Sequence, residues 1–425
     1  MTAEIAILNM SAACLAADSA VTIGVGENKK VYNSVNKIFE LSKKHPVAIM
    51  IYGNINFMNL PLEVLIKEFR KKIPDDGYNS LVEYADKFIE YLGNDIPYED
   101  VNEWIGAVSI IRSVALPNIK SACETIFRDS LTSGRPEKNK FGAKFSRKID
   151  ELIVSAEEYE DIPNIKNIKF PKDIILEAID DDICDSYFIG KISKANKNKI
   201  WKYFEIILRK NIMSKNLSGL VFCGFGNKDL CPTLVSYEID GIIGGQLKIQ
   251  QTKSVDIDRN KNPAFVSGFA QKDMVESFVD GASSDLLLHI QARMLFAIFA
   301  FRNKVLSLLV PDEEDDDLRK ELSKELQAPA VDIIKNEMRR LDEYMDKNYS
   351  QPLLQMVRFL PKSELPLVAG SLIELTSLKR KVSMEADTVG GDVDVAVISK
   401  AEGFVWIRRK HYFQPDLNTA YFRRF

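Results

Sequence analysis

The order of apolar and polar positions divides the chain into strand-rich and helix-rich blocks. Short apolar runs at residues 3–8 and 12–17 flank residues 9–11, which predicts two strands joined by a tight turn. The continuous apolar run at 46–52 ends at Gly53 and is typical of a strand that is covered on both faces. We therefore expect a sheet in the first part of the chain.

Helical periodicity takes over between about residues 60 and 130, where apolar residues recur three or four positions apart. Strand-like runs return later in the chain, at residues 219–226, 233–241, 244–253, 264–266, 393–399 and 403–408. Helical patterns occupy residues 271–310, 316–346 and 363–379. This alternation of blocks predicts layers, with helices outside and sheets inside.

We expect an α+β fold in which one sheet packs on another and helices cover both, a four-layer αββα sandwich with helical insertions. The whole chain, residues 1–425, is expected to form a single domain. Its core blocks are predicted at about 1–130, 216–284 and 361–413, and mainly helical insertions at 131–215 and 285–360.

Composition narrows the classes of function. With 46% hydrophobic and 28% charged residues, the chain can bury a sizeable core, which excludes general disorder. The net charge of −4 argues against a dedicated nucleic-acid binder. The chain has no run of about 18 consecutive apolar residues, so the sequence predicts no membrane-spanning helix. No basic segment precedes the first apolar run, so the sequence predicts no secretory signal. We expect a cytoplasmic protein without nucleic-acid or membrane partners.

Cysteine and histidine usage bears on compartment and metal chemistry. The 5 cysteines are scattered and form no CxxC pair, which indicates buried thiols in a reducing compartment. Only 3 histidines are present, too few for a site built on several histidine ligands. We therefore expect no metal and no cofactor.

The residue directly behind Met1 carries candidate chemistry. Thr2 is small enough for Met1 to be removed, and a methionine aminopeptidase would suffice because no propeptide precedes it. A terminal threonine combines a nucleophilic hydroxyl with an α-amine, whose pKa of roughly 8 allows it to take the proton. This is a variant of triad chemistry.

Three further segments follow Thr2 in the order in which a known family carries similar segments. They are Leu15-Ala16-Ala17-Asp18-Ser19, Val35-Asn36-Lys37-Ile38-Phe39-Glu40-Leu41 and Ala48-Ile49-Met50-Ile51-Tyr52-Gly53. Together with Thr2 the sequence resembles the proteasome β-subunit and HslV-like family of N-terminal nucleophile hydrolases. Segments near 219–226, 232–240, 264–268 and 388–408 resemble later strands of that family.

The resemblance implies a role for each matched residue. Thr2 would be the nucleophile. The positive charge of Lys37 would favour loss of the proton from the Thr2 hydroxyl, and Asp18 would hold Lys37 in place. The backbone N–H of Gly53 would donate to the oxyanion. The implied reaction is threonine-type hydrolysis of a peptide or amide bond, with a peptide or protein as substrate. Assembly of several copies is common among relatives and is left open here.

The chain departs from the family in its outer residues. An aspartate and a serine of the family fall on Ala386 and Val389, and a further serine falls near Phe269. The groups that tune the terminal amine therefore differ. Three alternatives stay open: a catalytically silent module for binding or assembly, an amidase for small amides, and an effector gated by a partner. Asp18 and Lys37 could also be a structural ion pair, and Gly53 could simply end a strand.

Overall fold

The chain folds into two compact units. The first comprises Met1–Ile38 and Asp256–Phe425, and the second comprises Phe39–Val255. A computed structural model describes residues 2–23, 30–132, 138–163, 172, 175–176, 192–310, 316–383 and 390–418.

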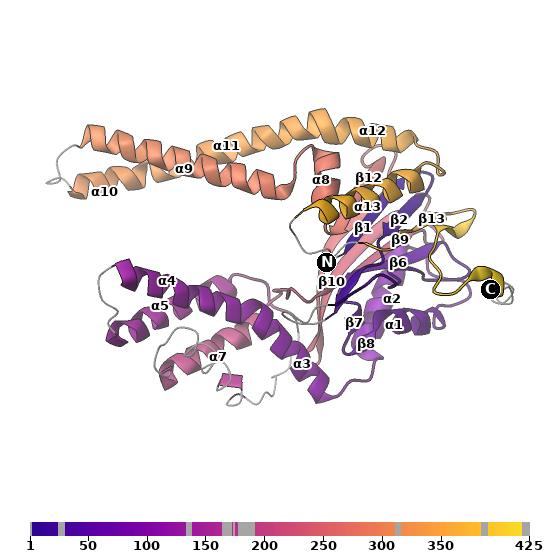
Figure 1. The fold of residues 1–425 in the computed structure, drawn as a ribbon, viewed down its shortest axis with the longest axis horizontal. Coiled ribbons are helices and arrows are strands. Elements are labelled where there is room, and N and C mark those ends of the chain that lie inside the picture. The colour runs from indigo at the N-terminus through magenta and orange to yellow at the C-terminus, as the bar shows by residue number, and fades with distance from the viewer. Residues whose placement is uncertain are drawn as a thin grey trace. The chain divides into compact units, whose positions relative to one another are not determined.

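The first unit is built on a five-stranded antiparallel sheet with the strand order β12-β1-β2-β13-β14 (Figure 1). Its strands are β1 (Ala3–Asn9), β2 (Ala13–Ala17), β12 (Ala264–Ala270), β13 (Asp394–Ser399) and β14 (Gly403–Arg408). A separate pair is formed by β3 (Val21–Ile23) and β4 (Lys30–Tyr32). β1 therefore starts next to Thr2 and lies inside the sheet, paired on both sides.

Helices cover one face of this sheet, namely α8 (Asp273–Asp280), α12 (Gln351–Phe359) and α13 (Leu365–Val382). Alternate residues of β1, among them Ile5 and Ile7, pack with Leu365 and Ile373 of α13 in one apolar cluster. Because strand side chains alternate between faces, Glu4 points to the face opposite this helical layer.

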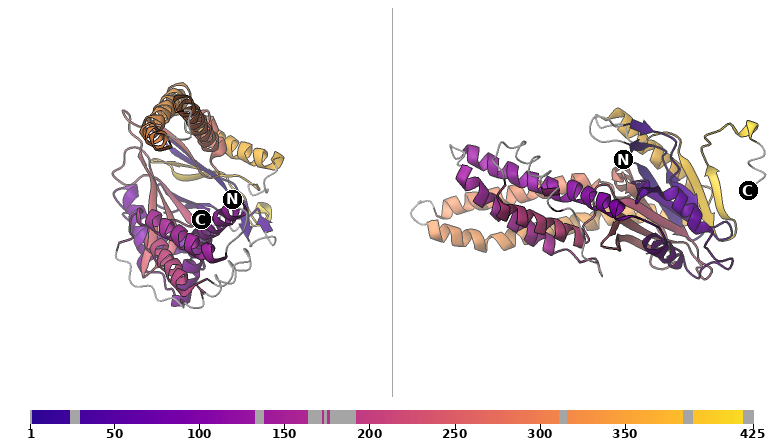
Figure 2. Two further views of the ribbon diagram at one scale, coloured as in Figure 1. Left: turned by 90° about the vertical axis from the view of Figure 1, so that its left-hand side faces the viewer. Right: turned by 90° about the horizontal axis from the view of Figure 1, so that it is seen from below.

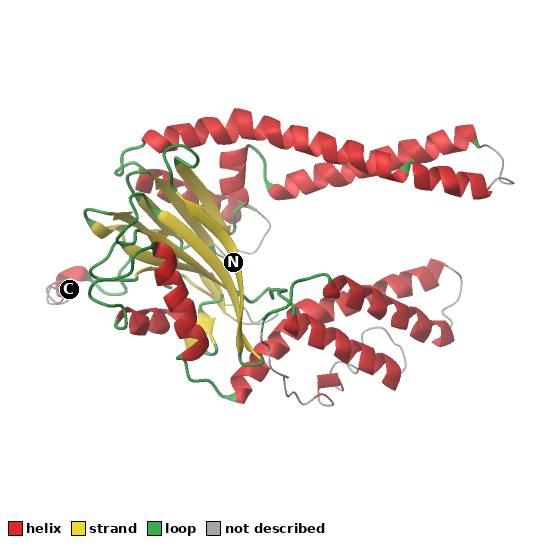
Figure 3. Cartoon of the chain, turned by 180° about the vertical axis from the view of Figure 1, so that it is seen from behind, coloured by secondary structure: helices red, strands yellow, loops and turns green. Residues whose placement is uncertain are grey.

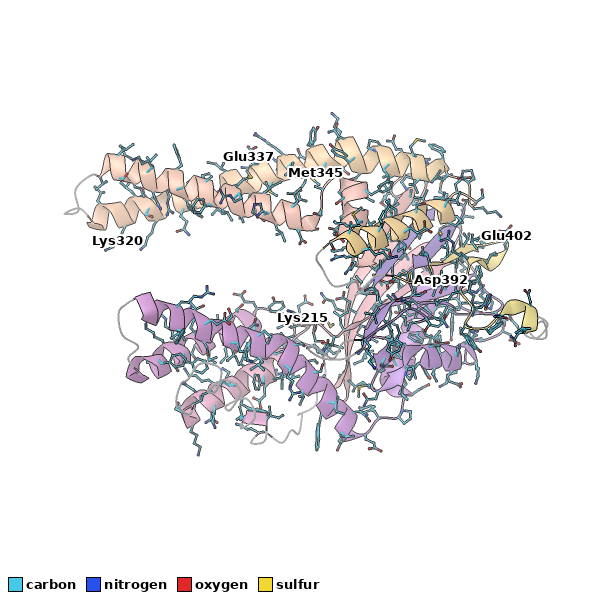
Figure 4. All side chains as sticks on the ribbon, in the orientation of Figure 1. Lys215, Lys320, Glu337, Met345, Asp392 and Glu402 are labelled. Atoms are coloured by element: carbon cyan, nitrogen blue, oxygen red, sulfur yellow. The ribbon has the colours of Figure 1, made fainter. Side chains whose placement is uncertain are left out.

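A long helical hairpin extends from α8. It contains α9 (Ser284–Leu309), α10 (Asp316–Glu325) and α11 (Gln327–Met345), and η3 (Asp346–Ser350) leads on to α12. Figures 1 and 2 show α9 and α11 running side by side, and Figure 4 marks Lys320 in α10 and Glu337 and Met345 along α11. By length and composition α9 could cross a membrane, although it contains no run of consecutive apolar residues that long. The expected absence of a membrane partner stays a prediction.

The second unit carries its own five-stranded antiparallel sheet, with the order β11-β10-β9-β6-β5. Figure 3 shows the strands in yellow and the helices in red. Its strands are β5 (Ile38–Glu40), β6 (Val47–Gly53), β9 (Ser218–Gly224), β10 (Thr233–Ile243) and β11 (Gln246–Asp256), and β7 (Asn56–Phe57) pairs with β8 (Leu60–Pro61). The helices α1 (Leu62–Arg70) and α2 (Leu81–Asn94) share one apolar core with β6, β9 and β10.

A second helical group branches from this unit. It consists of α3 (Asp100–Ile110), η1 (Ile111–Ala115), α4 (Leu116–Thr132), α5 (Lys138–Glu157) and α7 (Lys194–Arg209). These helices have their own apolar cluster, which includes Ile119, Phe145, Ile149 and Phe204. A short 3-10 turn, η4 (Pro415–Leu417), lies near the C-terminus.

The mixed α/β character with antiparallel sheets is confirmed. The predicted helix over 271–310 is instead two helices, because Gly281 takes the left-handed conformation (φ 80°) that ends α8. Within the segment 35–41, which resembles a family motif, only Ile38–Glu40 forms a strand. The four-layer arrangement and the division into one domain with two insertions stay predictions.

Candidate active site

The start of β1 brings two polar side chains into a buried environment. Thr2 is 3% exposed and Glu4 is fully buried. The Thr2 carbonyl accepts a hydrogen bond from the N–H of Gln271 at 3.0 Å, and the N–H of Ala3 donates to Asp18 Oδ1 at 3.0 Å. The backbone on each side of the Thr2 peptide is therefore fixed by its neighbours.

Asp18 follows directly after β2 and is 1% exposed. Besides Ala3, the N–H groups of Ala20 and Gly390 donate to its Oδ2 at 3.2 and 3.0 Å, and the Lys37 ammonium donates to Oδ1. Asp18 therefore joins the start of β1 to Lys37 and to the backbone at Gly390.

Lys37 stands immediately before β5 and its side chain is 1% exposed. Its ammonium contacts two carboxylates, those of Asp18 and of Glu4, the latter at 3.3 Å between Nζ and Oε1. The structure thus brings Lys37 and Asp18 together beside the strand that Thr2 precedes. A buried cation shared by two carboxylates leaves this group with one excess negative charge when all three are ionised.

Glu4 was not among the residues predicted from the sequence to belong to the site. Burial raises its pKa to about 7, against the lowering effect of Lys37. The negative charge of Asp18 raises the pKa further, and the Thr2 hydroxyl lies close enough to lower it. The available signal was a lone acidic residue in an otherwise apolar strand, two positions after Thr2 and therefore on the same face.

A cavity of about 500 Å³ opens beside Asp18. It is lined by residues of α13, of the segment before β13 and of the end of β14, including Lys381, Gly390, Gly391 and Arg409. Figure 4 marks Asp392, another lining residue. Thr2 and Lys37 are not among the residues that line it.

Gly53 ends β6 in the second unit and is exposed. Its φ is +74°, and a Cβ there would lie 2.5 Å from the Leu217 carbonyl oxygen. Local backbone geometry by itself therefore requires glycine. Its proposed part in an oxyanion hole stays a prediction.

The positions at which the sequence departs from the expected pattern fall in two places. Phe269 lies in β12, is buried and pairs with Glu4 across the sheet. Ala386 and Val389 lie outside the described residues. In the described part of the chain no three metal-binding side chains come together in a way that could hold an ion.

Comparison with known proteins gives little similarity. No family model matches the chain, and no curated protein matches it. Among solved structures, the Gly-1 mutant of Anbu from Hyphomicrobium sp. strain MC1 aligns over 100% of this chain and 94% of its own. The sequence identity is 8% and the TM-score is 0.25.

These findings correct the family assignment made from sequence. The prediction that the chain is a member of the proteasome β-subunit and HslV-like family is wrong, because no family model matches and the structural similarity is weak. Short motifs such as Leu15-Ala16-Ala17-Asp18-Ser19 occupy a small part of a long chain.

Proposed function

We propose that the protein is a threonine-type hydrolase that cleaves peptide or amide bonds, with Thr2 as nucleophile after removal of Met1. The observation that carries this proposal is the buried contact of Lys37 with both Asp18 and Glu4 beside the start of β1. Positive potential at Lys37 favours the deprotonated hydroxyl, and the fixed Asp18 carboxylate orients the ammonium.

The reaction proceeds as two acyl transfers. Oγ1 of Thr2 attacks the carbonyl carbon, the C–N bond breaks, and the proton released by the hydroxyl leaves on the amine product. Water then attacks the ester carbonyl carbon, the bond from that carbon to Oγ1 breaks, and the carboxylic acid product leaves while a proton from water restores the hydroxyl. The backbone N–H of Gly53 is our candidate donor to the oxyanion, and a peptide or protein is the candidate substrate.

We also infer a four-layer αββα sandwich from the order of strand blocks and helix blocks along the chain. Each unit supplies a five-stranded sheet with helices packed on it, α13 on β1 and β2 in the first unit and α2 on β9 and β10 in the second.

A silent binding or assembly module is the second candidate. It is favoured by the 3% exposure of Thr2 and by the cavity beside Asp18, whose lining does not include Thr2. In that case Lys37 and Asp18 serve only to join three segments of the fold.

Hydrolysis assays on purified full-length protein separate the two candidates. We expect turnover of fluorogenic peptides or simple amides by the wild type and by Thr2→Ser, and none by Thr2→Ala. Intact mass is expected to show loss of Met1. Retained Met1, or equal turnover in Thr2→Ala, contradicts the hydrolase. Preference for peptides or for simple amides distinguishes a peptidase from an amidase.

A further inference from the structure

Thr2 and Glu4 form a pair on one face of β1. Side chains two positions apart in extended chain point to the same side, and the segment from Thr2 onward is held extended by β12, with Ala3 opposite Ala270 and Glu4 opposite Phe269. The Thr2 hydroxyl is near enough to lower the pKa of Glu4. The carboxyl group therefore lies beside the nucleophile.

Both members of this pair lack a hydrogen bond of normal geometry, although the Thr2 hydroxyl and the Lys37 ammonium are close enough to lower the pKa of Glu4. Among the described residues, Oγ1 of Thr2 and both oxygens of Glu4 are buried and have no partner of normal hydrogen-bond geometry. Glu4 Oε1 has only its 3.3 Å ionic contact with Lys37. Buried carboxyl oxygens normally have hydrogen-bond partners, and a catalytic role is one explanation for an exception.

The charged surroundings of Glu4 set its titration. Lys37 and Asp18 are its closest charged neighbours, and the Asp394–Lys410 ion pair stands on the same face of the sheet beyond Ala17. Its cross-strand partners, Phe269 and Ala17, do not titrate. Burial dominates and raises its pKa to about 7, so the carboxyl group exchanges its proton near neutral pH.

We propose that Glu4 is the general base of the Thr2 hydroxyl, in place of the terminal amine. This inference rests on the proposed function. As the bond from Oγ1 to the carbonyl carbon forms, the hydroxyl proton moves to the Glu4 carboxylate and the carbonyl electron pair moves onto oxygen. When the C–N bond breaks, the Glu4 carboxylic acid gives that proton to the leaving nitrogen.

The rate of Thr2 acylation by a β-lactone, measured against pH, tests this assignment. Acylation is followed by peptide mass spectrometry at residue 2 from pH 5 to 10, for the wild type, Glu4→Gln, Glu4→Asp and the control Glu103→Gln. Glu103 is a glutamate of α3 whose pKa is also raised by burial, and it lies outside the group around Thr2.

We expect the wild-type and Glu103→Gln rates to rise with a midpoint near 7. Glu4→Gln should lose this midpoint and be slower by about 100-fold at pH 7.5, with any remaining rate following the terminal amine near roughly 8. Glu4→Asp should recover part of the rate with a shifted midpoint, an effect that a merely structural role would not produce.

Two results would overturn the assignment. An unchanged rate and midpoint in Glu4→Gln excludes Glu4 as base and leaves the threonine hydrolase intact. Absence of any adduct on residue 2 in the wild type overturns the proposed function and this inference with it. If Glu4→Gln fails to fold, a wild-type midpoint near 8 that is unmoved in Glu4→Asp also excludes Glu4.

Discussion

At the scale of single residues, the balance of charges around Lys37 determines the stability of the buried group beside the start of β1. Its side chain is 1% exposed, and its ammonium faces the buried carboxylates of Asp18 and Glu4. Removing one partner of a buried ion pair leaves uncompensated charge, which costs more than the pair itself contributes. Loss of Lys37 should therefore cost the most stability, because it leaves two buried carboxylates without a cation.

Replacement of the lysine tests this balance. We expect Lys37→Met to lower the free energy of unfolding by about 3–5 kcal/mol at pH 8, measured by urea denaturation. The loss should be smaller at pH 5, where Glu4 is protonated. Lys87→Met, at an exposed helical pair with Glu90, should change stability by less than about 1 kcal/mol. Equal effects of the two substitutions would contradict the buried-charge account.

Glu4 also predicts how stability depends on pH. Its pKa is about 7 in the folded chain against an ordinary 4.5, so the folded state binds more protons between these values and unfolding becomes easier as pH rises. The protonated Glu4 contributes roughly 3 kcal/mol to the free energy of unfolding at low pH. This contribution is lost as the pH rises through about 7.

Glu4→Gln removes this titration. The variant should be more stable than the wild type at pH 8 and nearly equal to it at pH 4.5, by urea denaturation at each pH. A pH profile that Glu4→Gln leaves unchanged would show that the carboxyl group is not perturbed by burial.

At the scale of elements, the backbone at the end of β6 requires glycine at residue 53. Gly53 has φ +74° and its missing Cβ leaves room for the Leu217 carbonyl oxygen. In contrast, Gly106 in α3 has open space at the Cβ position. Substitution by alanine is therefore expected to have opposite effects on stability at Gly53 and at Gly106.

Gly53→Ala should destabilise the protein by about 1–2 kcal/mol from the left-handed backbone alone, with a further contribution from the contact with Leu217. Gly106→Ala should stabilise it by about 1 kcal/mol, because glycine is a poor helix former. Urea denaturation of both variants measures the difference. A stable Gly53→Ala protein would mean that this turn relaxes and that the φ of residue 53 is not fixed.

Element patterns were readable where burial follows a simple period. The apolar runs at 3–8 and 46–52 correspond to β1 and β6, because strands buried on both faces are continuous in hydrophobicity. The helix end at Gly281 was not predicted, because a single left-handed residue ends a helix without changing the periodicity of the apolar residues around it. Glu4 was missed because its neighbours made the strand look uniformly apolar.

At the scale of the whole molecule, the pairing of Asp18 with Lys37 was implied only by the family resemblance, and the structure does bring the two side chains into contact. They lie in segments separated by β3 and β4, and only the fold brings Gly390 to the same carboxylate. Contacts of such long range depend on strand order, which no local pattern encodes. Motif similarity alone, in contrast, assigned a family that no family model supports.

The central claim is that residue 2 carries a free amine and a reactive hydroxyl in the native protein. An α′,β′-epoxyketone probes both groups, because it closes a ring through the oxygen and the nitrogen of a terminal threonine. Peptide mass spectrometry of the treated full-length protein locates the adduct. We predict one adduct on Thr2, absent from Thr2→Ala and strongly reduced in Lys37→Met. Retained Met1, or an adduct found only at other residues, would contradict the account.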